Sequence, residues 1–220
     1  MKGILFKPDM IKAIVEGRKT VTRRVIKPQP APGQAIDNLF GGFYLVEMGE
    51  NFPIDIIERV KPRYHVDETV YIKEAWRLGG YIWQKEAEII FRSDGAIIIV
   101  PWNDWLEKNT KYGASTGDIG AGKLHEWRSP MLLLADFARY FIQITDVRSE
   151  RLQEIENEPD GYKKEGYSPL YLMGKDGNQF EASLDFAWYE NLWDTINPKY
   201  PYSSNPWVFR HGFKPVPKGD

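Results

Sequence analysis

The sequence predicts an α+β fold, in which short strands and about four helices follow no regular strand–helix–strand order. Residues 20–26 are rich in β-branched side chains, and residues 141–147 alternate between apolar and polar, as strands do. Residues 185–196 instead carry apolar side chains at helical spacing. With 220 residues, 42% of them hydrophobic, the chain can bury a substantial core. We expect a single domain over residues 1–220.

Further elements are expected along the chain. Residues 3–6 form a strand that ends at Lys7-Pro8, and Asp9 caps a following helix that ends at Gly17. Other strands are expected at residues 40–46, 68–76, 88–92, 96–100 and 207–210, with a hairpin turn at residues 93–95. Helices are expected at residues 131–140 and 162–166. Residues 101–128 are rich in tryptophan, glycine and lysine and lack sustained periodicity, and we interpret residues 78–126 as an insertion on the core fold.

The most distinctive stretch is residues 16–27, which is strongly basic in a chain whose net charge is −2. On a strand, Thr22 and Arg24 share one face, and the preceding turn carries Lys19. We expect these three side chains to form a small site that attracts anions and contains a hydroxyl. A half-buried strand with a solvated basic face is the alternative. The basic residues of the stretch are Arg18, Lys19, Arg23, Arg24 and Lys27.

Composition excludes several kinds of site. The chain has no cysteine, which removes disulfides, thiol nucleophiles and cysteine-based metal sites. Its three histidines are far apart, so we expect no metal and no cofactor. No apolar run is long enough to span a membrane, and we expect a soluble cytoplasmic protein. Residues 117–123 match the start of a P-loop, but Leu124 replaces the required hydroxyl, and we interpret them as an ordinary loop.

Five motifs, in order along the chain, resemble the ASCH domain and in particular its phage and prophage branch. They are residues 4–8 (ILFKP), 17–24 (GRKTVTRR), 71–76 (YIKEAW), 145–153 (TDVRSERLQ) and 205–208 (NPWV). The resemblance implies a PUA-like β-barrel, mixed and mostly antiparallel, that is flanked by helices. It also implies a cleft suited to RNA or a nucleoside. The insertion at residues 78–126 falls outside it.

The resemblance also implies candidate catalytic residues. The ASCH signature, Gly-x-Lys-x-x-Glu-x-Arg, is matched by Gly17, Lys19 and Arg24, but Thr22 stands where the signature has glutamate. A similar replacement occurs in small ASCH enzymes that remove the acetyl group from N4-acetylcytidine with a lysine, a threonine and a later glutamate. By this resemblance Lys19 is the base, Thr22 the nucleophile and Glu165 the orienting carboxylate. Glu158 is the alternative to Glu165.

Residues of the same motifs are candidates for nucleic-acid or nucleoside binding. Cationic side chains would contact phosphate, and tryptophans could stack on a base. Glu74 could accept hydrogen bonds from a base edge. The alternatives are that the tryptophans are core residues and that Glu74 pairs with Lys73 or Arg77. The binding candidates are Lys7, Arg18, Arg23, Arg24, Glu74, Trp76, Asn205 and Trp207.

Three functions stay open from the sequence. The favoured one is recognition of RNA or a modified nucleoside in a basic cleft. The second is a metal-independent amidohydrolase acting on an acylated nucleobase, so that enzyme status is open. The third is a phage accessory protein that binds a protein partner through the tryptophan-rich insertion, which would require an exposed apolar patch there.

Overall fold

The computed structural model describes residues 1–83, 86–110, 126–173, 178–182 and 184–218. It confirms a mixed α and β composition with several sheets. The chain divides into two compact units, each described by itself below. Unit 1 comprises Met1–Lys12, Thr69–Ile142 and Val216–Asp220, and unit 2 comprises Ala13–Glu68 and Gln143–Pro215. The expected insertion lies in unit 1, and the P-loop-like residues 117–123 lie outside the described residues.

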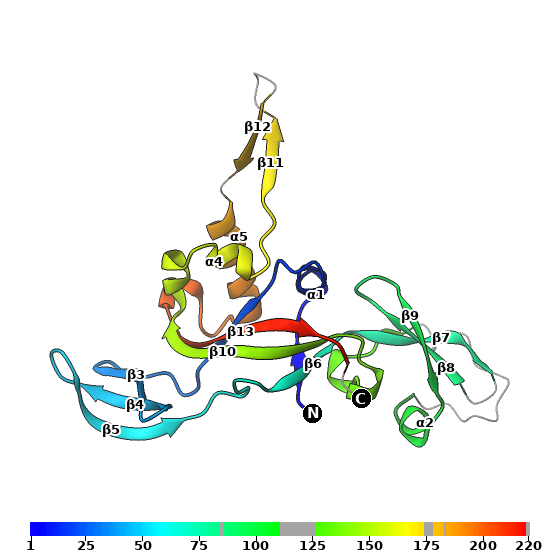
Figure 1. Ribbon diagram of the computed structural model, residues 1–220, viewed down its shortest axis with the longest axis horizontal. Helices are drawn as coiled ribbons and strands as arrows, with labels where there is room; N and C mark the ends of the chain where they lie inside the picture. Colours follow the sequence, from blue (N-terminus) through cyan, green and yellow to red (C-terminus); the bar gives the residue numbers. More distant parts are fainter. Residues whose placement is uncertain (84–85, 111–125, 174–177, 183, 219–220) are drawn as a thin grey trace. The chain divides into compact units, whose positions relative to one another are not determined.

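Unit 1 is built on two sets of strands (Figure 1). Strand β1 (Gly3–Leu5) runs parallel to β6 (Thr69–Lys73). Strands β7 (Trp76–Trp83), β8 (Glu86–Phe91) and β9 (Ile97–Pro101) form an antiparallel sheet, and the turn expected at residues 93–95 joins the last two. Helix α2 (Asp104–Thr110) contributes Leu106 to a core that also contains Trp76 and Phe91. All three side chains are essentially inaccessible to solvent.

Unit 2 contains a layer formed by β2 (Val21–Val25), β13 (Trp207–Val216) and β10 (Phe141–Arg151), with β13 in the middle. The first two residues of β10 belong to unit 1. Strand β2 pairs antiparallel with β13, so that His211 lies opposite Thr22 and Arg210 opposite Arg23. Because side chains alternate along a strand, Arg23 and Arg210 share one face of this layer, and Thr22, Arg24 and His211 share the other.

The two faces of this layer are covered differently. On the first face, Val208 packs with Leu152, Ile155 and residues of helix α5 (Asp185–Ile196). This face also meets the 3₁₀ helix η3 (Leu152–Asn157) and helix α4 (Gly161–Lys164). On the second face, Phe209 packs against the antiparallel sheet of β3 (Gln34–Leu39), β4 (Gly42–Met48) and β5 (Pro53–Val60). Unit 2 is therefore layered, with helices on one side of the central strands and a second sheet on the other.

Several sequence-based expectations hold and others do not. Helix α1 (Pro8–Val15), strand β2 and helix α5 lie where expected, and Gly17 has the positive φ of a helix C-cap, +74°. Asp9 is not the N-cap of α1, because the helix begins at Pro8 and Asp9 lies in its first turn. The helix expected at residues 131–140 is wrong. Two 3₁₀ turns, η1 (Pro130–Leu132) and η2 (Ala135–Phe137), replace it because the backbone of Leu133 and Leu134 is extended. Leu133 and Phe137 of this apolar run are buried in the core, but they do not form one face of a helix.

Strands β3 and β5 were not expected, and neither was the hairpin of β11 (Leu170–Met173) and β12 (Gln179–Ala182). A short 3₁₀ helix, η4 (Tyr202–Ser204), precedes β13. Every sheet formed by the described residues has two open edges, so none closes into a barrel. The coarse α+β class is therefore correct, while the described strands show no closed barrel of the PUA-like kind.

Candidate functional site

Lys19 is buried completely and held by two elements of unit 2. The backbone N–H groups of Arg18 and Lys19 both donate to the carbonyl of Ala13 at the end of α1, which directs the Lys19 side chain inward. Its Nζ donates to the Val21 carbonyl at 2.8 Å, to the Glu165 carbonyl at 2.8 Å and to Glu165 Oε2 at 2.6 Å. An ammonium has three N–H donors, and each of them has an acceptor here.

Glu165 reaches Lys19 because of the way α4 ends. Glu165 is the C-cap of α4, and its N–H donates to the Gly161 carbonyl. Gly166 follows with φ of +106°, a conformation that favours glycine. A Cβ at Gly166 would lie 3.3 Å from Ala13 Cβ and 3.5 Å from Lys19 Cβ, so a side chain there would crowd the approach of the two segments. The glycine thus permits the contact between Lys19 and Glu165.

Arg23 is the centre of a buried ionic cluster. Its Nε donates to Glu150 Oε1 at 2.7 Å, its Nη1 to Glu165 Oε1 at 3.0 Å and its Nη2 to Glu158 Oε2 at 2.6 Å. None of the Arg23 side chain is exposed. Burial opposes its charge, but Glu165, Tyr189 and Glu150 outweigh that penalty and raise the pKa of the guanidinium.

Burial and charge also act on the pKa of Lys19. Desolvation lowers it, Glu165 opposes that shift, and Arg24 and Arg23 add to it, so that the net pKa lies below the ordinary value for lysine. Glu165, which the ASCH resemblance implied as the orienting carboxylate, is the residue that pairs with Lys19.

Three further cations, Arg148, Lys164 and Arg210, bind the glutamates around Arg23. Glu158 accepts hydrogen bonds from Nε and Nη2 of Arg210 and from Lys164, and Arg148 Nη2 lies 3.6 Å from it. Burial tends to raise the pKa of Glu158, but Arg210 and Arg23 lower it to about 2. Arg148 also donates to Glu150 at 2.7 Å, and Arg210 donates to Asp146 at 2.8 Å. Glu150 and Glu158 are therefore each bound on both sides by cations.

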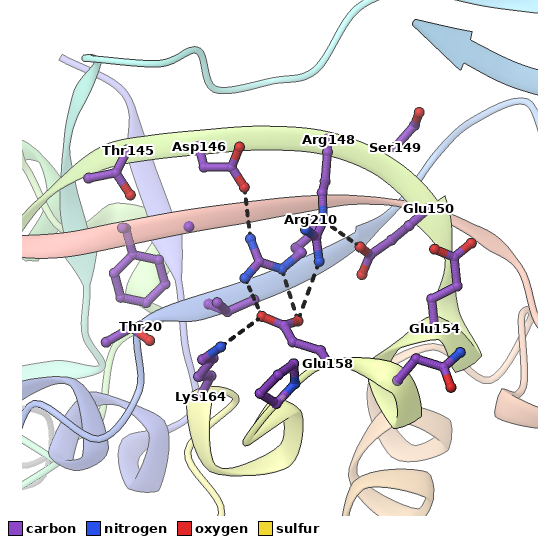
Figure 2. Close-up of a pocket in the computed structure, with 15 residues that line it drawn as sticks. Thr20, Thr145, Asp146, Arg148, Ser149, Glu150, Glu154, Glu158, Lys164 and Arg210 are labelled. Atoms are coloured by element: carbon purple, nitrogen blue, oxygen red, sulfur yellow. Dashed lines mark hydrogen bonds and ion pairs between the residues drawn. The ribbon is translucent and has the colours of Figure 1, made fainter.

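A cavity of about 770 Å³ is lined by these three cations (Figure 2). Arg148, Lys164 and Arg210 line it together with four carboxylates, and the side chains of Arg148 and Lys164 are 49% and 37% exposed. Figure 2 shows Arg210 reaching across β13 between Asp146 and Glu158. The lining carboxylates are Asp146, Glu150, Glu154 and Glu158, and the lining hydroxyls are Thr20, Thr145 and Ser149.

Thr22 and Arg24 do not line this cavity. Thr22 is 5% exposed and lies opposite His211 on the face of β2 that turns away from Arg23. Burial and Arg24 lower the pKa of His211 to about 4, so its imidazole is neutral at pH 7. Burial also lowers the pKa of Arg24. We expected Lys19 to act with Thr22 and Arg24. The structure instead joins it with Arg23 through a shared carboxylate, while the threonines that line the cavity are Thr20 and Thr145.

The remaining binding candidates of unit 2 are dispersed. Arg18 donates to the Gly166 carbonyl at 2.9 Å and pairs with Glu16. Asn205 accepts a hydrogen bond from the Gln153 N–H, with φ of +44°. Trp207 is half-buried, and the Arg151 guanidinium lies 4.9 Å from its ring centroid. These residues fix loops and cover an aromatic ring, and none of them lines the cavity.

The candidates in unit 1 have structural partners or lie at the surface. Trp76 is 0% exposed in the core, so neither face of its indole can stack on a base, which corrects the expectation of stacking there. Glu74 is 1% exposed and binds Arg139 Nη2 at 2.6 Å. The alternative of an ion pair was thus right in kind, but Arg139 is the partner instead of Lys73 or Arg77. Lys7 is exposed just before α1.

Of the charged residues that line the cavity, only Glu158, the alternative to Glu165, was a candidate from the sequence. The alternation noticed over residues 141–147 continues through β10 to Arg151, which places Asp146, Arg148 and Glu150 on one face. Extending that pattern would have identified them. The contributions of Lys164 and Arg210 depend on tertiary contacts, and no local pattern indicated them.

Comparisons with protein-family models, with curated proteins and with solved structures find no match for this chain. Among the described residues, no group of histidine and carboxylate side chains is arranged to hold a metal ion. No helix in the described part of the chain is both long and apolar enough to cross a membrane. The geometry of unit 2 is therefore what supports a functional proposal.

The pairing of Lys19 with Glu165 predicts strong coupling between two substitutions. Lys19→Met leaves Glu165 with one cation fewer in a buried site, and Glu165→Gln leaves a buried ammonium, so each should lower the free energy of unfolding by roughly 3 kcal/mol. The double variant removes both charges, and its loss of unfolding free energy should be clearly smaller than the sum of the two single losses. Urea unfolding at pH 7 measures all three. Additive losses would show that the two groups do not interact energetically.

The depressed pKa of Glu158 predicts a pH-dependent contribution to stability. The folded pKa of about 2 lies below the ordinary value of 4.5, so the ionised carboxylate stabilises the fold fully above about pH 4.5. That contribution is lost as the pH falls through 2. Glu158→Gln should cost roughly 2 kcal/mol at pH 7, and the difference from the natural chain should shrink between pH 4.5 and 2.5.

Unfolding in urea at a series of pH values tests this expectation. Glu58→Gln is the matched control, because Glu58 is exposed on β5 and pairs with none of the described cations. A Glu158→Gln deficit that stays constant down to pH 2.5 would contradict the assignment.

Proposed function

We propose that the cavity of unit 2 recognises a nucleoside unit, either free and modified or within an RNA strand. The observation that carries the proposal is the pair of exposed cations, Arg148 and Lys164, at a cavity that also presents carboxylates. Cations bind phosphate or base carbonyl oxygens, and carboxylates accept hydrogen bonds from exocyclic amines. A nucleotide carries both kinds of group.

The ionic network and the cavity wall together are balanced in charge. The ion pairs join five cations to four carboxylates, and Glu154, which lines the cavity outside these ion pairs, is a fifth carboxylate. The members are Lys19, Arg23, Arg148, Lys164 and Arg210 with Asp146, Glu150, Glu158 and Glu165. Because the buried members are fully engaged, the exposed Arg148 and Lys164 are the groups that can turn to a ligand.

The size and rigidity of the cavity are consistent with this proposal. A volume of about 770 Å³ lies within the usual range for small-molecule sites. The cations at its wall are held by glutamates that Arg23 in turn fixes, so they lose little freedom when a ligand binds. Under this proposal Lys19 and Arg23 position the wall and do not contact the ligand. The ordered motifs that resemble the ASCH domain, and with them a PUA-like ancestry, also support a nucleoside ligand.

Binding measurements with defined ligands test the proposal. We expect cytidine monophosphate and a short single-stranded RNA to bind in isothermal titration calorimetry, with N4-acetylcytidine and cytidine as the arms that lack phosphate. Arg148→Gln and Lys164→Gln should each weaken binding of the monophosphate about tenfold, since one charge-assisted hydrogen bond is worth roughly 1.5–3 kcal/mol.

Arg59→Gln is the matched control for these variants. Arg59 is exposed on β5 and does not line the cavity, and its substitution removes one positive charge as the other two do. Binding of RNA without binding of any single nucleoside or nucleotide would limit the site to polymer. If Arg148→Gln and Lys164→Gln bind the monophosphate as tightly as Arg59→Gln does, the proposal is contradicted.

A second candidate, amide hydrolysis on an acylated nucleobase, is favoured by the contact of 2.6 Å between Lys19 and Glu165. In this reaction a threonine Oγ attacks the acyl carbon and loses its proton to a lysine amine. The bond from carbon to the base nitrogen then breaks, the nitrogen receives the proton, and water hydrolyses the acyl-enzyme ester. Lys19 must first lose one of its three engaged protons, which its lowered pKa facilitates.

The identity of the nucleophile distinguishes two versions of this candidate. Thr22 follows the ASCH resemblance, but its side chain is 5% exposed, so the substrate would reach it only if β2 and its cover moved apart. Thr20 is half-buried and lines the cavity.

Incubation with N4-acetylcytidine, followed by chromatography for cytidine, tests the candidate. If the protein is this enzyme, we expect turnover that Thr22→Ala abolishes and Thr20→Ala retains. The reverse pattern would transfer the role of nucleophile to Thr20. If the natural chain produces no cytidine, the hydrolase candidate is rejected and only the binding proposal remains.

A further inference from the structure

Unit 1 presents an exposed indole between arginines. Trp127 is 41% exposed, and the guanidinium carbons of Arg77 and Arg92 lie 5.3 Å and 5.7 Å from its ring centroid. Both distances are within the range of cation–π attraction. We call Arg77, Arg92 and Trp127 the arginine–tryptophan patch. Nothing in the nucleoside site of unit 2 involves it.

Regular backbone pairing fixes the position of the patch. Arg128, next to Trp127, forms an antiparallel bridge with Trp76, whose side chain is wholly buried in the core. The Arg92 N–H donates to the Ala75 carbonyl at 2.9 Å, which extends the pairing of β7 with β8. Because Trp76 and Phe91 point into the core, the adjacent Arg77 and Arg92 point outward. The patch is therefore a built surface on the outer side of the sheet.

The charge of Arg92 sets this patch apart from the other arginine clusters. Arg139, also in unit 1, lies over the rings of Phe91 and Tyr140 but is neutralised by Glu74 and Asp94. Arg92 has no carboxylate within ion-pair distance among the residues that the structure describes. Its side chain is exposed and held by an aromatic ring, which leaves its five N–H donors facing solvent or a ligand.

We propose that the arginine–tryptophan patch binds single-stranded RNA. Guanidinium groups contact phosphates, and the planes of the indole and the guanidinium groups accept unpaired bases by stacking. An acidic peptide would use the positive charges alone and would gain little from the ring. The exposed indole is therefore what favours a nucleic acid, and the unpaired single strand is the form whose bases can reach it.

Fluorescence anisotropy of the full chain with a labelled ten-nucleotide oligouridine tests the proposal. Arg92→Gln should weaken binding about tenfold and reduce the slope of log affinity against log salt by about 0.7, the value for one phosphate contact on a single strand. Trp127→Leu should also weaken binding about tenfold, while Trp127→Phe, which keeps an aromatic face, should recover most of the affinity. Arg59→Gln is the control for loss of one exposed charge.

Each outcome decides between this surface and the cavity of unit 2. Loss of RNA binding in the Arg92→Gln and Trp127→Leu variants supports the proposal, whether or not the cavity binds a nucleotide. RNA binding that depends on Arg148 and Lys164 but not on Arg92 or Trp127 would overturn it and leave the nucleoside site intact. Binding of a labelled polyglutamate peptide in preference to the RNA would also overturn it.

Discussion

The structure of the candidate site depends on one buried guanidinium. Removing the charge of Arg23 from water is costly, and the fold compensates for it with three carboxylates. Glu150 comes from β10, Glu158 follows η3, and Glu165 ends α4, so that the ion pairs tie three separate segments to β2. Desolvated charges tolerate little displacement, and the segments around the cavity are therefore held in one arrangement.

This arrangement places charge in successive layers from the interior outward. Lys19 and Arg23 are buried, the glutamates surround them, and Arg148, Lys164 and Arg210 bind the outer sides of those glutamates. The buried cations thus hold the glutamates of the cavity wall in place, although they do not line the cavity themselves. A ligand would meet the outer layer, whose side chains are already oriented. The low pKa of Glu158 has the same cause, because cations approach that carboxylate from both sides.

Much of the local structure of this site was predictable, and its orientation was not. The sequence placed β2, the end of α1 and α5, and the ASCH resemblance anticipated Glu165 as the partner of Lys19. Alternation along β2 correctly separated Arg23 from Thr22 and Arg24, but it does not say which face meets the cavity. That choice follows from where the glutamates lie, and they are more than a hundred residues away along the chain. Burial of Trp76 was equally a tertiary outcome, since the same motif is compatible with a surface aromatic.

Arginines in two kinds of surroundings occur in this chain, whose net charge is −2. A cation bound by buried carboxylates contributes to the fold, and its charge is cancelled at short range. Arg23 and Arg139 are of this kind. A cation supported by an aromatic ring keeps its full charge, because the ring orients it without neutralising it. Arg92 belongs to this second kind. The slightly acidic total therefore says little about affinity for nucleic acid, since the charges that compensate the buried arginines are included in it and are not available to repel a phosphate.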